Sequence, residues 1–488
     1  MPATRLFLAL DQGGHASRAI LYDARGRAIA DAFAPLPTLR DARGHIEHAP
    51  DALIGSLRRA IDEVCAHPSI GRRRIVAAGL ATQRSSIACW HRDTGAPLAP
   101  IISWQDRRNA DWLEQFAPRA DWIRRTTGLA LTPHYGASKM RWCLDHVPAV
   151  RAAAAAGVLA MGPLASYIVH RLLTPSPFVA DPANASRTQL WDIATQDWSP
   201  ELLLLFGIDR AMLPRCVTSR HDYGMLETPA GPVPLTVVTG DQSAVPFAFG
   251  PLAPATAYIN IGTGAFVQRA IRDRLPEAPR LLASVVWSDA GGVDFMLEGT
   301  VNGAGSALDW FALHEGVAVA PHLTAIANGA AIPRTLPLFL NGVSGLGAPF
   351  WVSAFRSRFE GEGDARARLV AVLESIVFLI DNNLDELAPH GPPLDRIIVT
   401  GGMADNDFIC RTLASLARIP VFRSREREAT AKGLAYLVAG KPSAWPTQGE
   451  GDTFAPAGNA PLAARFSRWR AALDAAIAAD GAGPPRVA

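Results

Sequence analysis

The sequence predicts an α/β fold with two domains, each built from layers of strands and helices. Short apolar runs that end in glycine alternate with segments of helical spacing, and one pattern of strand, glycine turn and strand occurs twice. The length of 488 residues is too great for one ordinary core and predicts two domains, or three. Strands that alternate with helices also predict parallel strand pairs beside hairpins.

The repeated pattern begins near the N-terminus. The apolar run 6–10 is followed by a glycine turn and a second run, 19–22, which precedes the turn-prone residues 23–26. This order predicts a β-hairpin with a polar turn. The same pattern returns at 257–267, where Gly262, Thr263 and Gly264 separate two apolar runs. The chain is therefore predicted to be internally duplicated.

Other apolar runs that end in glycine predict strands, and segments with helical spacing lie between them. The predicted strands are 75–80, 235–240 and 397–402, and the predicted helices are 53–64, 367–384 and 408–417. The Pro- and Gly-rich stretch 442–456 predicts a surface excursion before a last amphipathic helix, 463–478.

A domain boundary is predicted at 247–254. Gly250, Pro251 and Pro254 would end any helix that starts after Asp241. The predicted domains are therefore 1–247 and 248–488.

The composition predicts a soluble, cytoplasmic protein with a small ligand. Lys and Arg number 47 and Asp and Glu 45, so the formal charge of +2 favours neither nucleic acid nor a membrane as partner. The five cysteines lie far apart with no Cys-x-x-Cys pair, which argues against a disulfide framework and a zinc site. The N-terminal apolar run is too short for a signal peptide, and no stretch approaches the ~20 residues of a membrane span.

Three glycine turns are candidates for binding phosphate: Gly13-Gly14, Gly262-Thr263-Gly264 and Gly401-Gly402. Glycine tolerates the backbone conformations that let N–H groups converge on phosphate oxygens. Each turn alone is more often structural, but two matched hairpin turns together are a stronger signal. No P-loop or Rossmann motif occurs, and His91-Arg92-Asp93 lacks the rest of the protein-kinase motifs and is interpreted as a tight turn.

Asp241 follows the apolar run that ends at Gly240, so it is predicted at the carboxyl end of a strand, where open α/β sheets bind ligands. A carboxylate at that place can cap a helix or act as a general base, and local sequence leaves both open.

Nine segments, in order along nearly the whole chain, resemble the FGGY carbohydrate kinases, and most closely the glycerol kinases of that family. They are Leu8–Gly13, Ser17–Ala19, Thr82–Arg84, Trp104–Arg108, Asn184–Thr188, Gly240–Gln242, Gly262–Gly264, Gly345–Pro349 and Gly401–Gly402.

This resemblance implies two actin-like (ribonuclease H-like) ATPase domains with an active-site cleft between them. Domain 1–247 would bind a small polyol or sugar and carry the base, and domain 248–488 would bind the nucleotide. It further implies ATP and Mg²⁺ as cofactors, phosphorylation of an alcohol group, and a homodimer or homotetramer.

The resemblance also implies roles for individual residues. Asp241 would be the base, and Asp11 and Asp241 would hold Mg²⁺. Around the acceptor it places Arg84, Ser85, Trp104, Tyr135, Asp241, Gln242 and Phe266. At the phosphates it places Gly13, Gly14, His15, Arg18, Gly262, Thr263 and Gly264, and along the adenine and ribose Gly305, Asp309, Gly402 and Asn406.

The chain departs from the glycerol kinases at several of these positions. Ser85 stands where they have a glutamate that accepts hydrogen bonds from the substrate, which makes glycerol doubtful and favours a longer polyol or a ketose. Gly14 and His15 replace paired threonines, and an imidazole could donate to a phosphate oxygen in place of a hydroxyl. Asp309 replaces a glutamine beside the adenine, and Asp407 and Thr400 are milder changes in the adenine loop.

Two alternatives share this scaffold. One is a nucleotide-binding regulatory protein with weakened catalysis, which the presence of Asp11, Arg18, Asp241 and Thr263 disfavours. The other is a phosphohydrolase, which would need no acceptor pocket, so that Arg84, Trp104 and Tyr135 argue against it.

Overall fold

The computed structural model describes residues 5–327, 335–446 and 449–480. The chain forms two compact units, each made from several segments. Unit 1 consists of Met1–Leu252, Ser284–Phe295 and Arg427–Gln448, and unit 2 of Ala253–Ala283, Met296–Glu426 and Gly449–Ala488.

The main sheet of unit 1 is mixed and has the strand order β10-β15-β16-β6-β1-β2-β3. Its strands are β1 (Arg5–Gln12), β2 (Ala16–Asp23), β3 (Ala28–Pro35), β6 (Arg74–Thr82), β10 (Leu173–Thr174), β15 (Arg220–Leu226) and β16 (Val233–Gly240). β1 pairs antiparallel with β2 and parallel with β6, and β6 pairs parallel with β16. The predicted N-terminal hairpin and the parallel pairs beside it are confirmed.

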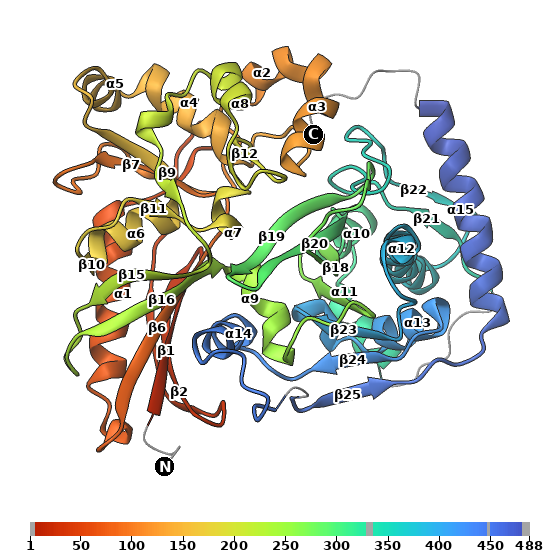
Figure 1. The fold of residues 1–488 in the computed structure, drawn as a ribbon. Helices are drawn as coiled ribbons and strands as arrows, with labels where there is room; N and C mark the ends of the chain where they lie inside the picture. The colour runs from red at the N-terminus through yellow and green to blue at the C-terminus, as the bar shows by residue number, and fades with distance from the viewer. Residues whose placement is uncertain (1–4, 328–334, 447–448, 481–488) are drawn as a thin grey trace. The chain divides into compact units, whose positions relative to one another are not determined.

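Helices cover both faces of this sheet (Figure 1). On one face lies α1 (Pro50–Cys65), whose Ser56 hydroxyl is 2.8 Å from that of Ser17 on β2. On the other face lies α14 (Ala429–Val438), which approaches so closely that a Cβ at Gly79 of β6 would be 2.5 Å from a methyl of Val438.

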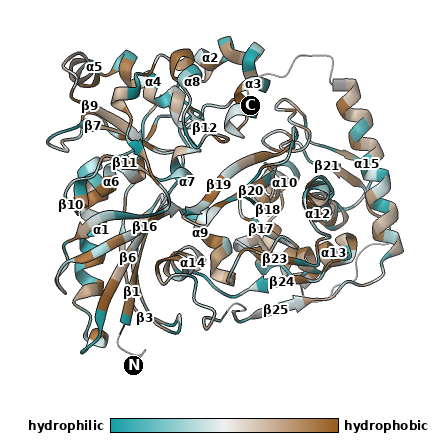
Figure 2. Ribbon diagram, in the orientation of Figure 1, coloured by the Kyte–Doolittle hydropathy of each residue, from teal (hydrophilic) through white to brown (hydrophobic). Residues whose placement is uncertain are grey.

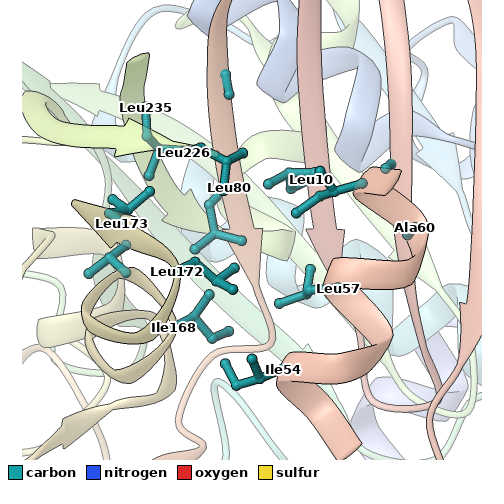
Figure 3. Close-up of a cluster of buried hydrophobic side chains, with 14 of the residues drawn as sticks. Leu10, Ile54, Leu57, Ala60, Leu80, Ile168, Leu172, Leu173, Leu226 and Leu235 are labelled. Atoms are coloured by element: carbon teal, nitrogen blue, oxygen red, sulfur yellow. The ribbon is translucent and has the colours of Figure 1, made fainter. Parts of the chain in front are cut away.

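The hydrophobic core of unit 1 lies under α1 and α6 (Leu164–Leu172). Figure 3 shows Ile54, Leu57 and Ala60 of α1 and Ile168 of α6 beside the leucines of the strands. Every second residue of a strand points to the same face, so the apolar residues of β1, β2 and β6 on this side bury themselves against the two helices.

A second, five-stranded sheet of unit 1 has the order β4-β5-β8-β7-β9. Its strands are β4 (Leu39–Arg40), β5 (Ile46–His48), β7 (Ile87–His91), β8 (Ile101–Ile102) and β9 (Leu159–Pro163). The other elements of unit 1 are α2 (Ala110–Leu113), α3 (Ala120–Thr127), α4 (Gly136–His146), α5 (Pro148–Ala155), α7 (Pro182–Ala185), α8 (Pro200–Phe206), α9 (Asp241–Ala244), β11 (Val179–Ala180), β12 (Trp191–Asp192), β13 (Asp197–Trp198) and β14 (Arg215–Cys216). A turn follows β7 at Arg92 and Asp93, as the sequence predicted.

The main sheet of unit 2 has the order β19-β20-β18-β17-β23-β24-β25, although Ser284–Phe295, which contains most of β19 and the start of β20, is assigned to unit 1. Its strands are β17 (Thr256–Ile261), β18 (Ala265–Arg272), β19 (Leu282–Asp289), β20 (Gly292–Val301), β23 (Arg396–Thr400), β24 (Val421–Ser424) and β25 (Gly451–Phe454). The remaining elements are α10 (Gly305–Glu315), α11 (Val319–Ala327), α12 (Ala365–Leu387), α13 (Asp407–Ala417), α15 (Ala460–Asp480), β21 (Leu338–Leu340) and β22 (Arg358–Glu360).

The two main sheets repeat one connection pattern. In unit 2, β17 pairs antiparallel with β18 and parallel with β23, and β23 pairs parallel with β24. These are the pairings of β1 with β2 and β6, and of β6 with β16. The predicted internal duplication is confirmed.

The stretch 442–456 corrects one prediction. It contains β25, which pairs with β24, and Trp445 is buried beside Phe7 and Tyr22 of unit 1, so it is no simple surface excursion. Turn-forming composition marks where the chain bends but does not reveal the strand and the buried ring between the bends. Residues 447 and 448 of this stretch lie outside the described residues. The last helix is α15 as predicted, with both hydrophobic and hydrophilic residues along its length (Figure 2).

Candidate active site

Three parallel strands of unit 1 end in one row. Gln12 of β1 and Gly240 of β16 both pair with Thr82 of β6. The residues that follow these strand ends, including Arg84 and Asp241, therefore lie at one edge of the sheet. The carboxyl edge of parallel strands is where such sheets bind ligands.

Asp241 is the first residue of α9, and Gly240 takes the N-cap position. Its Oδ1 accepts a hydrogen bond of 2.6 Å from the backbone N–H of Gln242 and lies 3.9 Å from Nε of Arg84. Although 24% of the side-chain surface is exposed, burial raises the pKa of the Asp241 carboxyl, while the charges of Arg84 and Arg187 act to lower it. A carboxylate with a raised pKa is a better proton acceptor than an ordinary one.

Arg84 reaches Asp241 because residue 240 is glycine. A Cβ at Gly240 would lie 2.5 Å from both Cγ and Cδ of Arg84, so a side chain there would displace the arginine stem. The absence of a Cβ therefore lets the guanidinium lie along the end of β16.

Asp11 lies one residue before the end of β1 and faces Arg18, its partner in the β1–β2 hairpin, with 3.9 Å between Oδ2 and Nη1. The pKa of Asp11 is raised to about 7, mainly by burial and also by the charges of Asp241 and Glu428, while the charge of Arg18 acts to lower it. Nε of Arg18 is in turn 3.5 Å from Glu428. Asp11, Asp241 and Glu428 thus lie near one another in the region where the resemblance predicts the metal and the phosphates.

The turn after β1 contains Gly13, Gly14 and His15, and its carbonyl oxygens all accept hydrogen bonds within unit 1. The donors are Gln12 Nε2 and Gln83 Nε2 to Gly13 O (2.6 and 3.3 Å), Thr38 Oγ1 to Gly14 O (3.1 Å) and Leu36 N to His15 O (2.8 Å). The N–H of Gly13 donates to the carbonyl of Ala16 at 2.9 Å, so the Gly13 amide that the resemblance placed at the phosphates is engaged within the turn. The backbone groups that this turn can offer a ligand are therefore the N–H groups of Gly14 and His15, which suit an anion.

Ser85 lies on the loop after β6 in a left-handed conformation, with φ of 64°. Its carbonyl oxygen accepts a hydrogen bond of 3.2 Å from Nζ of Lys139, which also donates to the carbonyl of His134 at 2.7 Å. Lys139 is fully buried, and this burial lowers its pKa to about 7. A buried ammonium group thus supports the loop that carries Arg84 and Ser85.

Trp104 is tied to the same loop. Its backbone N–H donates to the hydroxyl of Ser86, which donates to Oε1 of Gln83, each at 2.9 Å. The indole remains 43% exposed. Tyr135, by contrast, is buried, and the guanidinium of Arg187 lies over its ring at 5.1 Å. The acceptor residues predicted in domain 1–247 therefore belong to one connected region of unit 1.

The turn of unit 2 joins β17 to β18 and contacts the start of α10. The N–H of Gly262 donates to the carbonyl of Gly264 at 2.8 Å. The carbonyl of Gly262 accepts from Gly305 N at 2.9 Å, and that of Thr263 accepts from Ser306 N at 3.1 Å. Carbonyls are engaged in this turn too, which again favours its N–H groups as ligands for an anion.

The other predicted nucleotide residues lie on different elements of unit 2. Asp309 is an exposed residue of α10, and Gly402 begins a 3₁₀ helix after β23. Asn406 caps α13, because its Oδ1 accepts from the backbone N–H of Phe408 at 2.9 Å. Its amide thus has a structural task in addition to any role at the nucleotide. Phe266, on β18, is 37% exposed.

Comparisons with known proteins bear on what these groups do. Residues 6–248 match the model of the FGGY family of carbohydrate kinases, N-terminal domain, and residues 257–440 match that of the C-terminal domain. The chain belongs to the FGGY family of carbohydrate kinases.

Curated relatives of this FGGY kinase include two glycerol kinases. That of Geobacter sp. (strain M21) is 34% identical over 88% of this chain and 89% of its own. That of Bordetella parapertussis is 34% identical over 97% of both chains. Among solved structures, Plasmodium falciparum glycerol kinase with ADP has a TM-score of 0.89 at 21% identity, covering 97% of this chain and 98% of its own.

The FGGY kinase is thus an ATP-dependent phosphotransferase that acts on an alcohol group of a polyol or sugar. The relatives named here are kinases, which gives no support to the regulatory alternative. Its fold is the two-domain, actin-like fold of the family.

Sequence reasoning missed Glu428 and Lys139. Glu428 precedes α14, far along the chain from Arg18, and no motif connects the two residues. Lys139 follows Tyr135 in α4, and the sequence does not show that its ammonium group is buried under Ser85. For Lys139, the one sequence feature that could have indicated a buried charge is its position as a lysine among small and apolar residues at the start of a helical segment.

The carboxylates of unit 1 suit a hard cation. Magnesium in kinases is held by one or two carboxylates together with phosphate oxygens of the nucleotide. Asp11 and Asp241 would provide two such groups, and they are close enough for the charge of Asp241 to raise the pKa of Asp11. Among the described residues no group of three or more His, Cys, Asp and Glu side chains could hold a metal by itself, so the phosphates would have to complete the site.

Within the same residues no helix is long and apolar enough to cross a membrane.

Proposed function

We propose that this kinase transfers the terminal phosphoryl group of ATP to a hydroxyl of a polyol or ketose longer than glycerol, with Asp241 as the general base. The observation that supports this role is the position of Asp241 at the end of β16, beside Arg84 and close enough to Asp11 to raise its pKa. The base would accept the proton of the acceptor hydroxyl as the phosphoryl group arrives.

The other groups would orient the reactants and neutralise charge. Arg18 and the N–H groups of Gly14 and His15 would contact phosphate oxygens, as would Thr263 with its neighbouring turn amides in unit 2. Asp11 and Asp241 would hold Mg²⁺, whose positive charge offsets that of the phosphates. Phosphoryl transfer depends mainly on such placement and charge stabilisation.

The proposed acceptor class rests on Ser85. Hydrogen bonds to a charged group contribute roughly 1.5–3 kcal/mol, so a serine in place of glutamate should weaken glycerol by about ten- to a hundredfold. Arg84 and the exposed Trp104 would offer a polar and an apolar contact to an acceptor with more hydroxyl groups, and the buried Tyr135 would support them. The glycerol kinases named above act on glycerol, and this proposal separates the present chain from them.

A coupled ADP-release assay tests both parts. The panel would contain glycerol, erythritol, tetruloses, pentuloses, pentitols and hexuloses, and the highest kcat/KM is expected for a compound of four to six carbons. A glycerol value equal to or above all of these would reject the acceptor proposal.

The base is tested by Asp241→Asn. General-base catalysis contributes typically 10²–10⁴-fold, so a loss of about that size in kcat is expected while ATP still binds in calorimetry. A variant with normal turnover would reject Asp241 as the base, whatever the acceptor.

A further inference from the structure

One exposed aromatic residue of unit 1 has no part in the proposed reaction so far. Phe33 lies on β3, the edge strand of the main sheet, where exposed residues alternate with buried alanines. The residue is 55% exposed. A single exposed apolar side chain is ordinary in proteins, so its neighbours decide whether it has a role.

The strand register connects Phe33 with Asp11. Phe33 is the direct partner of Arg18 in the β2–β3 ladder, and Arg18 is the direct partner of Asp11 in the β1–β2 ladder. Directly opposed residues of antiparallel strands point to the same face of the sheet. The three side chains therefore form one row across three strands.

Within this row the guanidinium of Arg18 lies over the Phe33 ring and near two carboxylates. Its Cζ lies 5.4 Å from the centre of the Phe33 ring, within the range of a cation–π contact. On its edges, Nη1 is 3.9 Å from Asp11 and Nε is 3.5 Å from Glu428. Arg18 is still 39% exposed and so remains open to a ligand.

A guanidinium held in this way loses less freedom when it binds an anion. Arginine has a long and flexible side chain, and immobilising it on binding opposes association. A ring in contact with the guanidinium limits that freedom in advance, and because the contact uses the π face of the ring it does not occupy the N–H groups as a hydrogen-bond acceptor would.

We propose that Phe33 is a positioning residue for the nucleotide, whose ring holds the guanidinium of Arg18 in the orientation that binds the phosphates. This inference rests on the proposed contact between Arg18 and the phosphates. It assigns to β3 a function that no sequence motif marks.

The first test measures binding of a non-hydrolysable ATP analogue to the full chain by calorimetry. Phe33→Ala should weaken binding by about two- to fivefold, the value of an exposed cation–π contact. The KM for ATP should rise similarly, with kcat at saturating ATP changed less. Leu204→Ala removes another exposed apolar side chain of unit 1, 85% exposed on α8, and should leave binding unchanged.

The chemistry of the side chain separates stacking from simple apolar cover. Phe33→Trp keeps an aromatic face and should bind the analogue at least as tightly as the wild type. Phe33→Leu keeps apolar bulk without the π face and should bind like Phe33→Ala. Wild-type binding by Phe33→Leu would overturn the proposal, and melting temperatures would confirm that each variant is folded.

A double-mutant cycle distinguishes failure of this inference from failure of the proposed phosphate contact. Arg18→Gln should weaken analogue binding, and Phe33→Ala should add nothing to it, because the ring would then have no cation to hold. If Arg18→Gln binds normally, the phosphate contact fails and the role of Phe33 falls with it. If Arg18→Gln weakens binding but Phe33→Ala has no effect, or has the same effect in both backgrounds, only the positioning role is overturned.

Discussion

The two glycine hairpins of this FGGY kinase have the same strand pairing and turn length but different side chains beside the turn. In unit 1 three residues, Gly13 to His15, join β1 to β2, and in unit 2 three residues, Gly262 to Gly264, join β17 to β18. Both turns engage their carbonyl oxygens inside their own unit.

The residues next to the turns differ in charge. The first hairpin carries the opposed pair Asp11 and Arg18, and the matching pair in the second is Asn260 and Phe266. Asn260 donates a hydrogen bond to Thr400, a contact within the sheet. The two hairpins thus share a backbone pattern, while the opposed pair beside the first turn is charged and the opposed pair beside the second is not.

The largest expected effect is that of making the first hairpin resemble the second. Asp11→Asn removes a proposed Mg²⁺ ligand, and loss of such an electrostatic group typically lowers turnover by about 10²–10³-fold. Assays over a range of Mg²⁺ concentrations should show this loss, with partial recovery at high Mg²⁺. Asn260→Ala is the matched control and should leave the Mg²⁺ dependence unchanged. Normal activity of Asp11→Asn would show that the charge of Asp11, which distinguishes the first hairpin from the second, does not contribute to catalysis.

The same carboxyl should make stability depend on pH. The pKa of Asp11 is raised from 3.8 to about 7, so the folded state holds a proton that the unfolded state has lost between about pH 4 and 7. The free energy of unfolding should therefore fall as pH rises through that range, by up to about 4 kcal/mol from this group.

Asp11→Asn lacks this titration. Its melting temperature relative to the wild type should increase from pH 4 to pH 8 in EDTA, and Mg²⁺ with nucleotide should reduce the difference. A constant difference across pH would contradict the raised pKa.

The two turns should also differ in their tolerance of a methyl group. A Cβ at Gly264 would lie 2.8 Å from the carbonyl oxygen of Val301, whereas one at Gly14 would meet nothing within 4 Å. Gly264→Ala should therefore destabilise unit 2 by about 1–3 kcal/mol, and Gly14→Ala should stay within about 0.5 kcal/mol of the wild type. Thermal unfolding measures both, and equal shifts would mean that the second turn relaxes as freely as the first.

The smallest expected effect concerns His15, an exposed residue of the first turn. If its imidazole donates to a phosphate oxygen, His15→Ala should raise the KM for ATP by about two- to tenfold, the value of one hydrogen bond. Leu204→Ala again serves as the control. An unchanged KM would mark His15 as a surface residue that the first turn does not need.

Sequence patterns predicted much of the fold because its signals are local. Short apolar runs located β1, β2, β17 and β18, and glycine marked the turns between them. Asp241 was placed at a strand end because its apolar run ended at Gly240. The predicted surface excursion at 442–456 was wrong, since composition could not show that part of it pairs with β24 and buries Trp445.

The sequence predicted which residues belong to the candidate site better than it predicted their pKa values and contacts. Motif resemblance named Asp11, Arg18, Arg84 and Asp241, and the structure brings them together in unit 1. Their catalytic roles, and the division of roles between the two predicted domains, stay predictions for the assays above.

The order of the hairpins, the parallel strands and the motif residues follows from the sequence alone. The spacing of apolar residues and the choice of turn residues act over only a few positions, so both can be recognised without the structure. The tertiary structure alone decided the pKa of Asp11, the contact of Glu428 with Arg18 and the stacking of Phe33 on that arginine. Burial and Coulomb interactions depend on distances between residues that are remote along the chain. Those distances are set by the pairing and register of the strands, which the sequence pattern does not specify.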